Sequence, residues 1–153
     1  MSLFPRAVLG AVAAGLIAFG SAAVAQSSSS STTTLSARLS GASEVPPSPS
    51  NAKGNLQATL DKNSRVLTWT LQVDGLSGPP TAAHFHGPAA PGDNAGVAAP
   101  MNVTGQPTDN GAVTLTAAQM DDLLAGRWYV NVHTAAHPDG EIRGQVMIRQ
   151  APQ

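Results

Sequence analysis

The stretch that decides the fold is Gly54–Val73, "GNLQATLDKNSRVLTWTLQV". Apolar and polar residues alternate on both sides of its polar centre, "DKNSR". The apolar positions are Leu56, Ala58 and Leu60 before the centre, and Leu67, Trp69, Leu71 and Val73 after it. Because side chains in a strand point to opposite faces in turn, this period of two predicts two half-buried strands joined by a turn. The stretch is therefore interpreted as a β-hairpin.

The same reading extends outward along the chain. Further short strands are predicted over residues 81–86, 97–103, 111–116, 128–133 and 141–149, separated by turns rich in Gly and Pro. Pro100 lacks a donor for a strand ladder, so residues 97–103 are expected at a sheet edge. Long helix–strand alternation is absent from the sequence pattern. We therefore predict an all-β fold, an antiparallel Greek-key-like β-sandwich or barrel with one short helix.

The one helix is predicted within "TAAQMDDLLAGR", residues 116–127. Thr116 and Gln119 have the spacing of a capping box, in which each side chain bonds the backbone of the other residue. Met120, Leu123 and Leu124 share a face, which is expected to pack on the sheet. Gly126 suits the left-handed position that ends many helices.

The N-terminal region predicts export. Residues 1–25 hold Arg6, an apolar run and a small-residue exit at Ala23 and Ala25, which is typical of a cleaved secretory signal peptide. An uncleaved membrane anchor is the alternative, although the apolar run is short for a span. Residues 26–34 are interpreted as a Ser/Thr-rich linker and residues 35–150 as one β domain. We expect a periplasmic or secreted protein without a membrane span after cleavage.

Composition excludes several classes of function. Cleavage of the signal peptide removes one of the eight basic residues, Arg6, and none of the nine acidic ones. The mature chain therefore has seven basic and nine acidic residues. The sequence has no basic patch of the kind that would indicate a nucleic-acid partner. The cysteine count is zero, which excludes disulfides, thiol catalysis and thiolate metal ligands. Any metal ion would be held by histidine, carboxylate, methionine or backbone groups.

All four histidines occur in two compact motifs, "AHFHGPA" and "NVHTAAHPDG". Phe85 is expected to face the core, so alternation turns His84 and His86 to the other face. Trp128, Val130 and Val132 are expected on the core face of the later strand, which places His133 opposite them. If the two strands are neighbours, three imidazoles converge. These residues predict a metal site for copper, with zinc as the alternative.

The surroundings of this site carry further expectations. His137 lies in the following turn and is a candidate fourth ligand. Tyr129, on the same face as His133, is a candidate donor to a ligand. Ile142, Val146 and Ile148 are expected to face the core, with Glu141 and Arg143 paired on the opposite face. The competing interpretation is that the histidines are merely solvated or hydrogen-bonding residues.

Three segments resemble the CHRD domain, a family named for its repeats in chordin: "LSGASEVPPSPSNAKGNLQATL", "GLSGPPTAAHFHGPAAPGDNAGV" and "GRWYVNVHTAAHPDGEIRGQV". The resemblance spans Leu35 to Ile148 and follows the family's order of motifs. It implies a β-rich extracellular module. In chordin the module belongs to an antagonist of bone morphogenetic proteins, a role that need not transfer to a free-standing domain.

The histidine motifs also resemble the copper site of copper/zinc superoxide dismutases, which are antiparallel Greek-key sandwiches. His84 and His86 match the strand pair that seats copper there, and His133 or His137 would supply the rest. Arg143 would correspond to the arginine that guides the anion. The sequence departs from those enzymes in lacking a disulfide and a bridging histidine with a zinc-site aspartate. This resemblance implies at most a copper-only site.

Two functions remain open on the sequence. One is an exported metal-binding domain, copper favoured, with superoxide dismutase-like redox activity as its enzymatic form. The other is a non-enzymatic binding module for a protein or glycan partner of the cell envelope.

Overall fold

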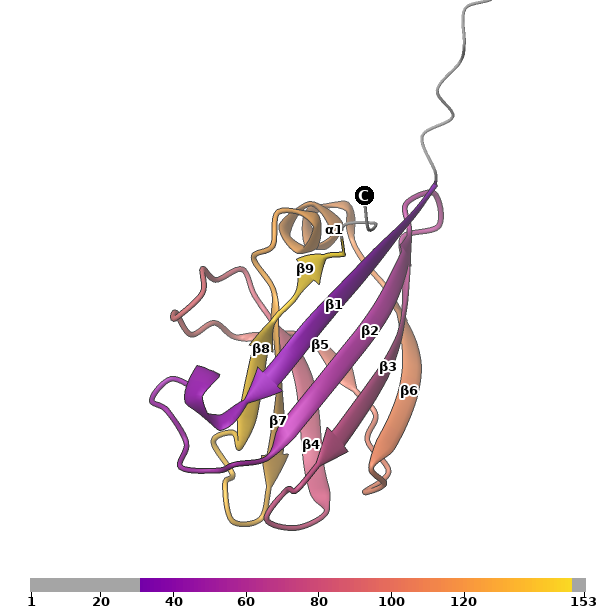
Figure 1. Cartoon of the computed structure of the whole chain (residues 1–153). Helices are drawn as coiled ribbons and strands as arrows, with labels where there is room; N and C mark the ends of the chain where they lie inside the picture. Colours follow the sequence, from indigo (N-terminus) through magenta and orange to yellow (C-terminus); the bar gives the residue numbers. More distant parts are fainter. Residues whose placement is uncertain (1–30, 150–153) are drawn as a thin grey trace, which may run out of the picture.

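The computed structural model describes residues 31–149, and they form one antiparallel β structure with one short helix (Figure 1). The strands are β1 (Thr32–Ser40), β2 (Lys53–Asp61), β3 (Val66–Asp74), β4 (Pro80–His86), β5 (Val97–Met101), β6 (Thr108–Thr114), β7 (Tyr129–Thr134), β8 (Ile142–Gln145) and β9 (Met147–Ile148). A 3₁₀ turn, η1 (Gly41–Ser43), follows β1, and the helix α1 spans Ala117–Leu124. The predicted signal peptide, residues 1–25, lies outside the described residues.

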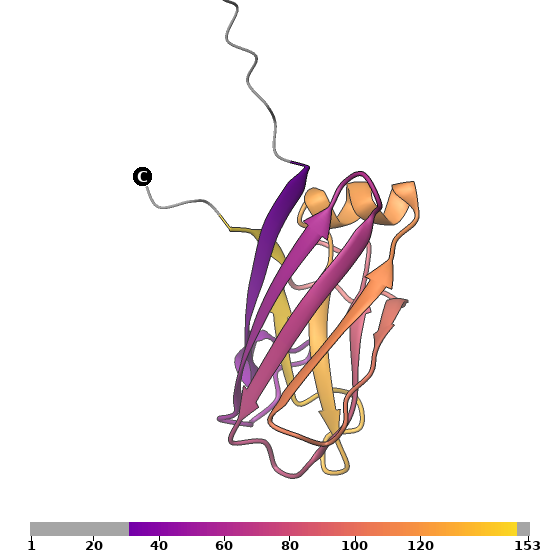
Figure 2. The same cartoon turned by 90° about the vertical axis from the view of Figure 1, so that its right-hand side faces the viewer.

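The strands form one sheet that curls into a nearly closed barrel. Their order is β5-β4-β7-β8-β1-β2-β3-β6, and β9 adds to β1. The neighbours β4–β7, β8–β1 and β3–β6 are far apart in sequence, which is typical of Greek-key-like connections. The two views of Figures 1 and 2 show this sheet wrapped around its interior, with α1 across one end. The predicted fold class is confirmed.

The predicted hairpin is fully paired in the sheet. β2 and β3 pair without a shift from Lys53↔Asp74 to Asp61↔Val66, as the alternation predicts. Apart from the partly buried Val66 and Val73, their apolar side chains are buried in a common core with Phe85, which lies between two indole rings. The ring centroids of Phe85 are 6.5 Å from Trp69 and 5.8 Å from Trp128. β5 lies at one edge of the sheet, as Pro100 predicts.

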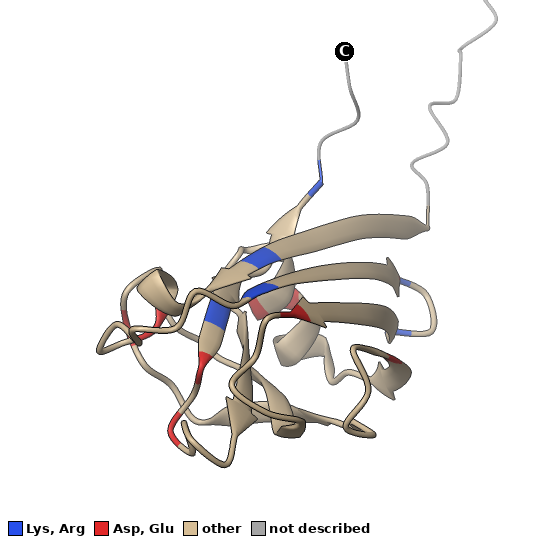
Figure 3. Cartoon of the chain, turned by 60° about the horizontal axis from the view of Figure 1, so that its bottom comes forward, with Lys and Arg blue, Asp and Glu red and all other residues tan. Residues whose placement is uncertain are grey.

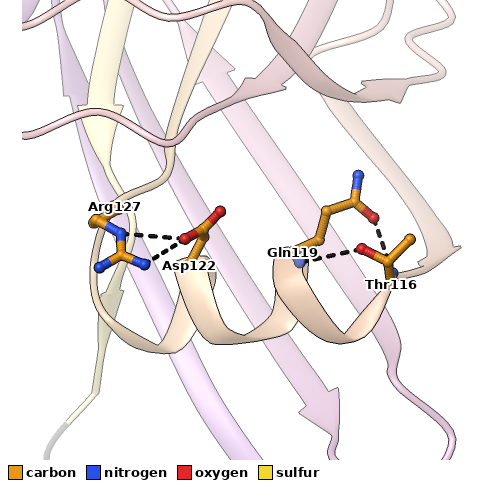
Figure 4. Close-up of polar contacts among 4 residues, drawn as sticks. All are labelled: Thr116, Gln119, Asp122 and Arg127. Atoms are coloured by element: carbon orange, nitrogen blue, oxygen red, sulfur yellow. Dashed lines mark hydrogen bonds and ion pairs between the residues drawn. The ribbon is translucent and has the colours of Figure 1, made fainter.

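The helix begins as its capping box predicts. The Thr116 hydroxyl accepts from the Gln119 amide, and the Gln119 side chain accepts from the Thr116 amide (Figure 4). At the other end Gly126 has a φ of 70°, the left-handed conformation that suits glycine. Arg127 forms an ion pair with Asp122 and holds this end against the last turn. Within residues 31–149, no helix is long and apolar enough to cross a membrane.

The last predicted strand, residues 141–149, is wrong in detail. It is split into β8, which pairs with β7, and β9, which pairs with β1. The split occurs at Val146, whose amide donates to the Trp128 carbonyl. Ile148 therefore lies at the rim of the barrel beside α1, and it is 46% exposed instead of facing the core.

The expected surface pair of Glu141 and Arg143 is also wrong. Both side chains are buried, and they bond different partners. Glu141 is fully buried and accepts hydrogen bonds from the Ser50, Ser77 and Thr134 hydroxyls and from the Ser77 amide. The reason is that loops cover this face of β7 and β8, which strand alternation alone does not reveal.

Candidate metal centre

The register between β4 and β7 assembles the histidines. His84 lies opposite Asn131, His86 opposite Tyr129, and Ala82 opposite His133. All six residues belong to the face of the sheet turned away from the core, since alternate positions on paired strands share a face. The small Ala82 side chain leaves the His133 ring free to lean diagonally over His84, and their ring centroids are 5.1 Å apart.

Three ring nitrogens converge on this face. His84, His86 and His133 each offer one ligand atom, and these atoms all lie within 4.8 Å of one another. His84 Nδ1 and His133 Nε2 are 3.2 Å apart. Two ligands that bind one ion at about 2.0 Å, separated by a tetrahedral angle, lie about 3.3 Å from each other. This pair already has the spacing of adjacent ligands, so the group could hold a metal ion.

Backbone carbonyls fix the orientation of two of the rings. His133 Nδ1 lies 2.9 Å from the Pro138 oxygen, and His86 Nδ1 lies 2.9 Å from the Ala95 oxygen. A carbonyl oxygen can only accept, so Nδ1 of each ring carries the proton and donates it. The Nε2 lone pairs then point into the site when these rings are neutral. Histidines that bind metals commonly have their second nitrogen held in this way.

The surroundings also favour neutral imidazoles. Burial lowers the pKa of His84, and the nearby His133 and His86 rings lower it further. Burial lowers the pKa of His133 as well, although its bond to the Pro138 carbonyl and the charge of Asp139 oppose this. A metal ion binds the unprotonated ring nitrogen, so a lowered pKa keeps the ligands available at neutral pH.

The structure does not bring His137 into this group. His137 lies in the turn after β7, which is closed by two backbone hydrogen bonds between Thr134 and His137. Its ring is not among the three whose nitrogens cluster. Its role as a fourth ligand stays a prediction without support from the geometry.

Arg143 lies on the same face, but it contacts Tyr129 instead of the imidazoles. Its guanidinium carbon is 3.5 Å from the centre of the Tyr129 ring, and the Tyr129 ring stacks on His86 at 4.8 Å. Arg143 also donates to the Asn94 side chain and the Asp93 carbonyl and is only 2% exposed. These contacts tie down the loop between β4 and β5. The expected role as anion guide stays a prediction.

Two contributors to the site were missed by the sequence analysis. Ala95 contributes the carbonyl that orients His86, and its amide and carbonyl both lie 3.2 Å from the Tyr129 hydroxyl. Asn131 places Oδ1 3.0 Å from His86 Nε2. Strand alternation places Asn131 on the same face as His133. Its contact with His86 depends on the register between β4 and β7, which the sequence does not reveal.

Charged residues are sparse and of mixed sign along the described chain, as the ribbon in Figure 3 shows. One of them, Glu44, is buried just after η1. It is only 7% exposed, and its Oε1 has no hydrogen-bond partner among the described residues. Burial raises the pKa of Glu44 to about 7, although the charge of Arg143 and the Val45 amide oppose the rise.

This burial predicts a pH dependence of stability. Between pH 4.5 and about 7 the folded chain retains the Glu44 proton that the unfolded chain has released, so stability falls as the pH rises through this window. Glu44→Gln, which cannot ionise, is expected to gain about 1–2 kcal/mol relative to the parent protein between pH 4.5 and pH 8, after allowance for solvent screening. Urea unfolding of both proteins at the two pH values measures this. An equal difference at both would contradict the assignment.

The fold and the site together define a class, an antiparallel β-barrel domain with a three-histidine cluster on its outer face. A family model, that of the CHRD domain, matches residues 35–146. The chain belongs to the CHRD domain family, which confirms the resemblance seen in the sequence motifs. No curated protein and no solved structure gives a significant match.

Proposed function

We propose that the chain is an exported domain that binds one transition-metal ion, copper in preference to zinc, through His84, His86 and His133. The observation that carries this proposal is the convergence of three ring nitrogens within 4.8 Å, two of them oriented by backbone carbonyls. Imidazole ligands suit both metals, and the general affinity order of divalent ions favours copper. Export is inferred from residues 1–25.

The direct test is copper loading of the purified chain without residues 1–25. We expect one Cu²⁺ per chain, with a nitrogen-rich paramagnetic resonance spectrum. The thermal midpoint should rise, since an ion at 100 times its dissociation constant stabilises the folded state by about 2.7 kcal/mol. The double variant His84→Ala/His86→Ala should lose both signals while its circular dichroism is unchanged. A double variant that keeps the parent spectrum would remove the proposal.

The enzymatic form of the proposal is superoxide dismutase-like redox activity. It follows from the site-level resemblance, and it requires one coordination position that the protein leaves to a small molecule. The matched control is the same chain loaded with zinc, which has no redox chemistry. Superoxide removal by the copper-loaded chain, in excess of both the zinc-loaded chain and free copper chelates, supports this form. Equal removal by both loaded proteins excludes it.

A second candidate is a non-enzymatic binding module for a protein or glycan partner. The outer face of β1, β2 and β3 favours it, because exposed hydroxyl and amide side chains such as Thr59, Gln57 and Thr70 occupy much of it. Thermal melts separate the candidates. No change of midpoint at saturating copper or zinc favours the binding module, in which the histidines serve only as hydrogen-bonding residues.

A further inference from the structure

We infer that Asn131 Oδ1 is the fourth donor to the ion, so that the centre has three nitrogens and one amide oxygen. This inference rests on the proposed function, and it adds a ligand that the histidine motifs do not contain. Asn131 is directly opposite His84 in the β4–β7 ladder, and it is two residues from His133 on the same face of β7. Its side chain is 5% exposed, so it belongs to the interior of the site.

The contact between Asn131 and His86 is the first support. Oδ1 and His86 Nε2 lie 3.0 Å apart, while the Ala95 carbonyl holds His86 Nδ1. In a neutral ring oriented by that carbonyl, Nε2 carries a lone pair and no proton. Two lone pairs then face each other at hydrogen-bond distance, which is repulsive unless a proton or a metal ion lies between them. A metal ion satisfies both atoms at once.

The other end of the amide is the second support. A Cβ atom built on Gly140 would lie 3.0 Å from Asn131 Nδ2 and 2.5 Å from Glu44 Oε1. The amide nitrogen therefore lies on the Gly140 side, as does Glu44 Oε1, although the two atoms form no hydrogen bond with each other. On the side of an acceptor oxygen, the amide nitrogen, a donor, is favoured over the amide oxygen, which would be a second acceptor. This orientation leaves Oδ1, and not Nδ2, toward His86.

The spacing of the donor atoms is the third support. Ligands bound at about 2.0 Å lie about 2.8 Å apart at a right angle and about 3.3 Å apart at a tetrahedral angle. The His84–His133 pair, at 3.2 Å, and the Asn131–His86 pair, at 3.0 Å, both lie in this range. Each of these two pairs thus has the spacing of adjacent ligands of one ion. His84 binds through Nδ1, and His86 and His133 bind through Nε2.

The test compares Asn131→Ala and Asn131→Asp with the parent protein in the full chain. Copper affinity is measured by competition with a chelator, and coordination by paramagnetic resonance. We expect Asn131→Ala to bind copper at least about 10-fold more weakly, and Asn131→Asp more tightly because its oxygen is anionic. Both should shift the copper hyperfine splitting. Asn110→Ala, an exposed position on β6, is the matched control and should leave both quantities unchanged.

The outcomes separate the inference from the function on which it rests. If Asn131→Ala binds copper as tightly as the parent protein or more tightly, with the same spectrum, the amide only competes for His86 and the inference is overturned, although the three-histidine site stands. If Asn131→Ala does not fold, an Asn131→Asp spectrum identical to that of the parent protein overturns it equally. If the parent protein binds no copper, the proposed function itself fails.

Discussion

Glu141→Ala is expected to lower the free energy of unfolding by about 3–5 kcal/mol, the largest change in stability predicted for this chain. The carboxylate is fully buried and joins three separate segments, through Ser50, Ser77 and Thr134. Removing it leaves their hydroxyls and the Ser77 amide without an acceptor, and an unpaired buried polar group costs about 1–3 kcal/mol. Urea unfolding at pH 7 measures the change.

The effect should depend on pH in a defined direction. Burial alone would raise the pKa of Glu141, but the three hydroxyls and the Ser77 amide outweigh it and lower the pKa to about 2. A lowered pKa means that the contribution to stability is complete above pH 4.5 and is lost as the pH falls toward 2. The difference between the parent protein and Glu141→Ala should therefore shrink in that window.

The matched control for Glu141 is Asp121→Ala, at an exposed position on α1. Its change in unfolding free energy is expected to stay within about 0.5 kcal/mol and to show no such pH dependence. If Glu141→Ala were no less stable than this control, the hydrogen bonds to Glu141 would make no net contribution to stability, and the prediction would be wrong.

His133→Ala is expected to weaken copper binding by more than about 100-fold, whereas His137→Ala should change it less than about 2-fold. His133 lies near the end of β7 and His137 in the turn four residues later, and composition and net charge change equally in both variants. Only His133 has a ring nitrogen in the cluster with His84 and His86. Chelator competition with Cu²⁺ gives both dissociation constants.

The pair of variants decides between the geometry and the motif. Equal weakening in both would mean that the turn after β7 rearranges to bring His137 to the ion, as the sequence motif allowed. Weakening in neither would mean that copper binds elsewhere on the chain. Circular dichroism without metal shows whether each variant keeps the β fold, since the Pro138 carbonyl loses its donor in His133→Ala.

Much of the fold could be predicted because the signals are local. The alternation in residues 54–73 requires only that one face of each strand be buried away from water. The register of the β2–β3 pair follows from that pattern. The capping box of Thr116 and Gln119 is decided within one helical turn. Ile148 was misplaced because the end of a strand run does not reveal where the barrel ends, and that limit is set by β1 and α1.

The candidate site could be predicted in part for the same reason. Alternation is enough to place His84, His86 and His133 on the outer face, because Phe85 and Val132 must be buried. Their approach depends on the register of β4 and β7, which are adjacent only because the sheet closes across segments about 50 residues apart. The Asn131 amide and the Ala95 carbonyl are ordinary groups in sequence, and they acquire a role only through that register.

By itself, then, the chain's alternation of apolar and polar residues determined an antiparallel β domain and the side of the sheet on which three imidazoles lie. Only the tertiary structure decided that these imidazoles meet, that His137 stays outside, and that Glu141 and Arg143 are buried. The physical reason is range: the facing of a side chain follows from its immediate neighbours, whereas contact and burial follow from pairing and coverage by segments distant in sequence.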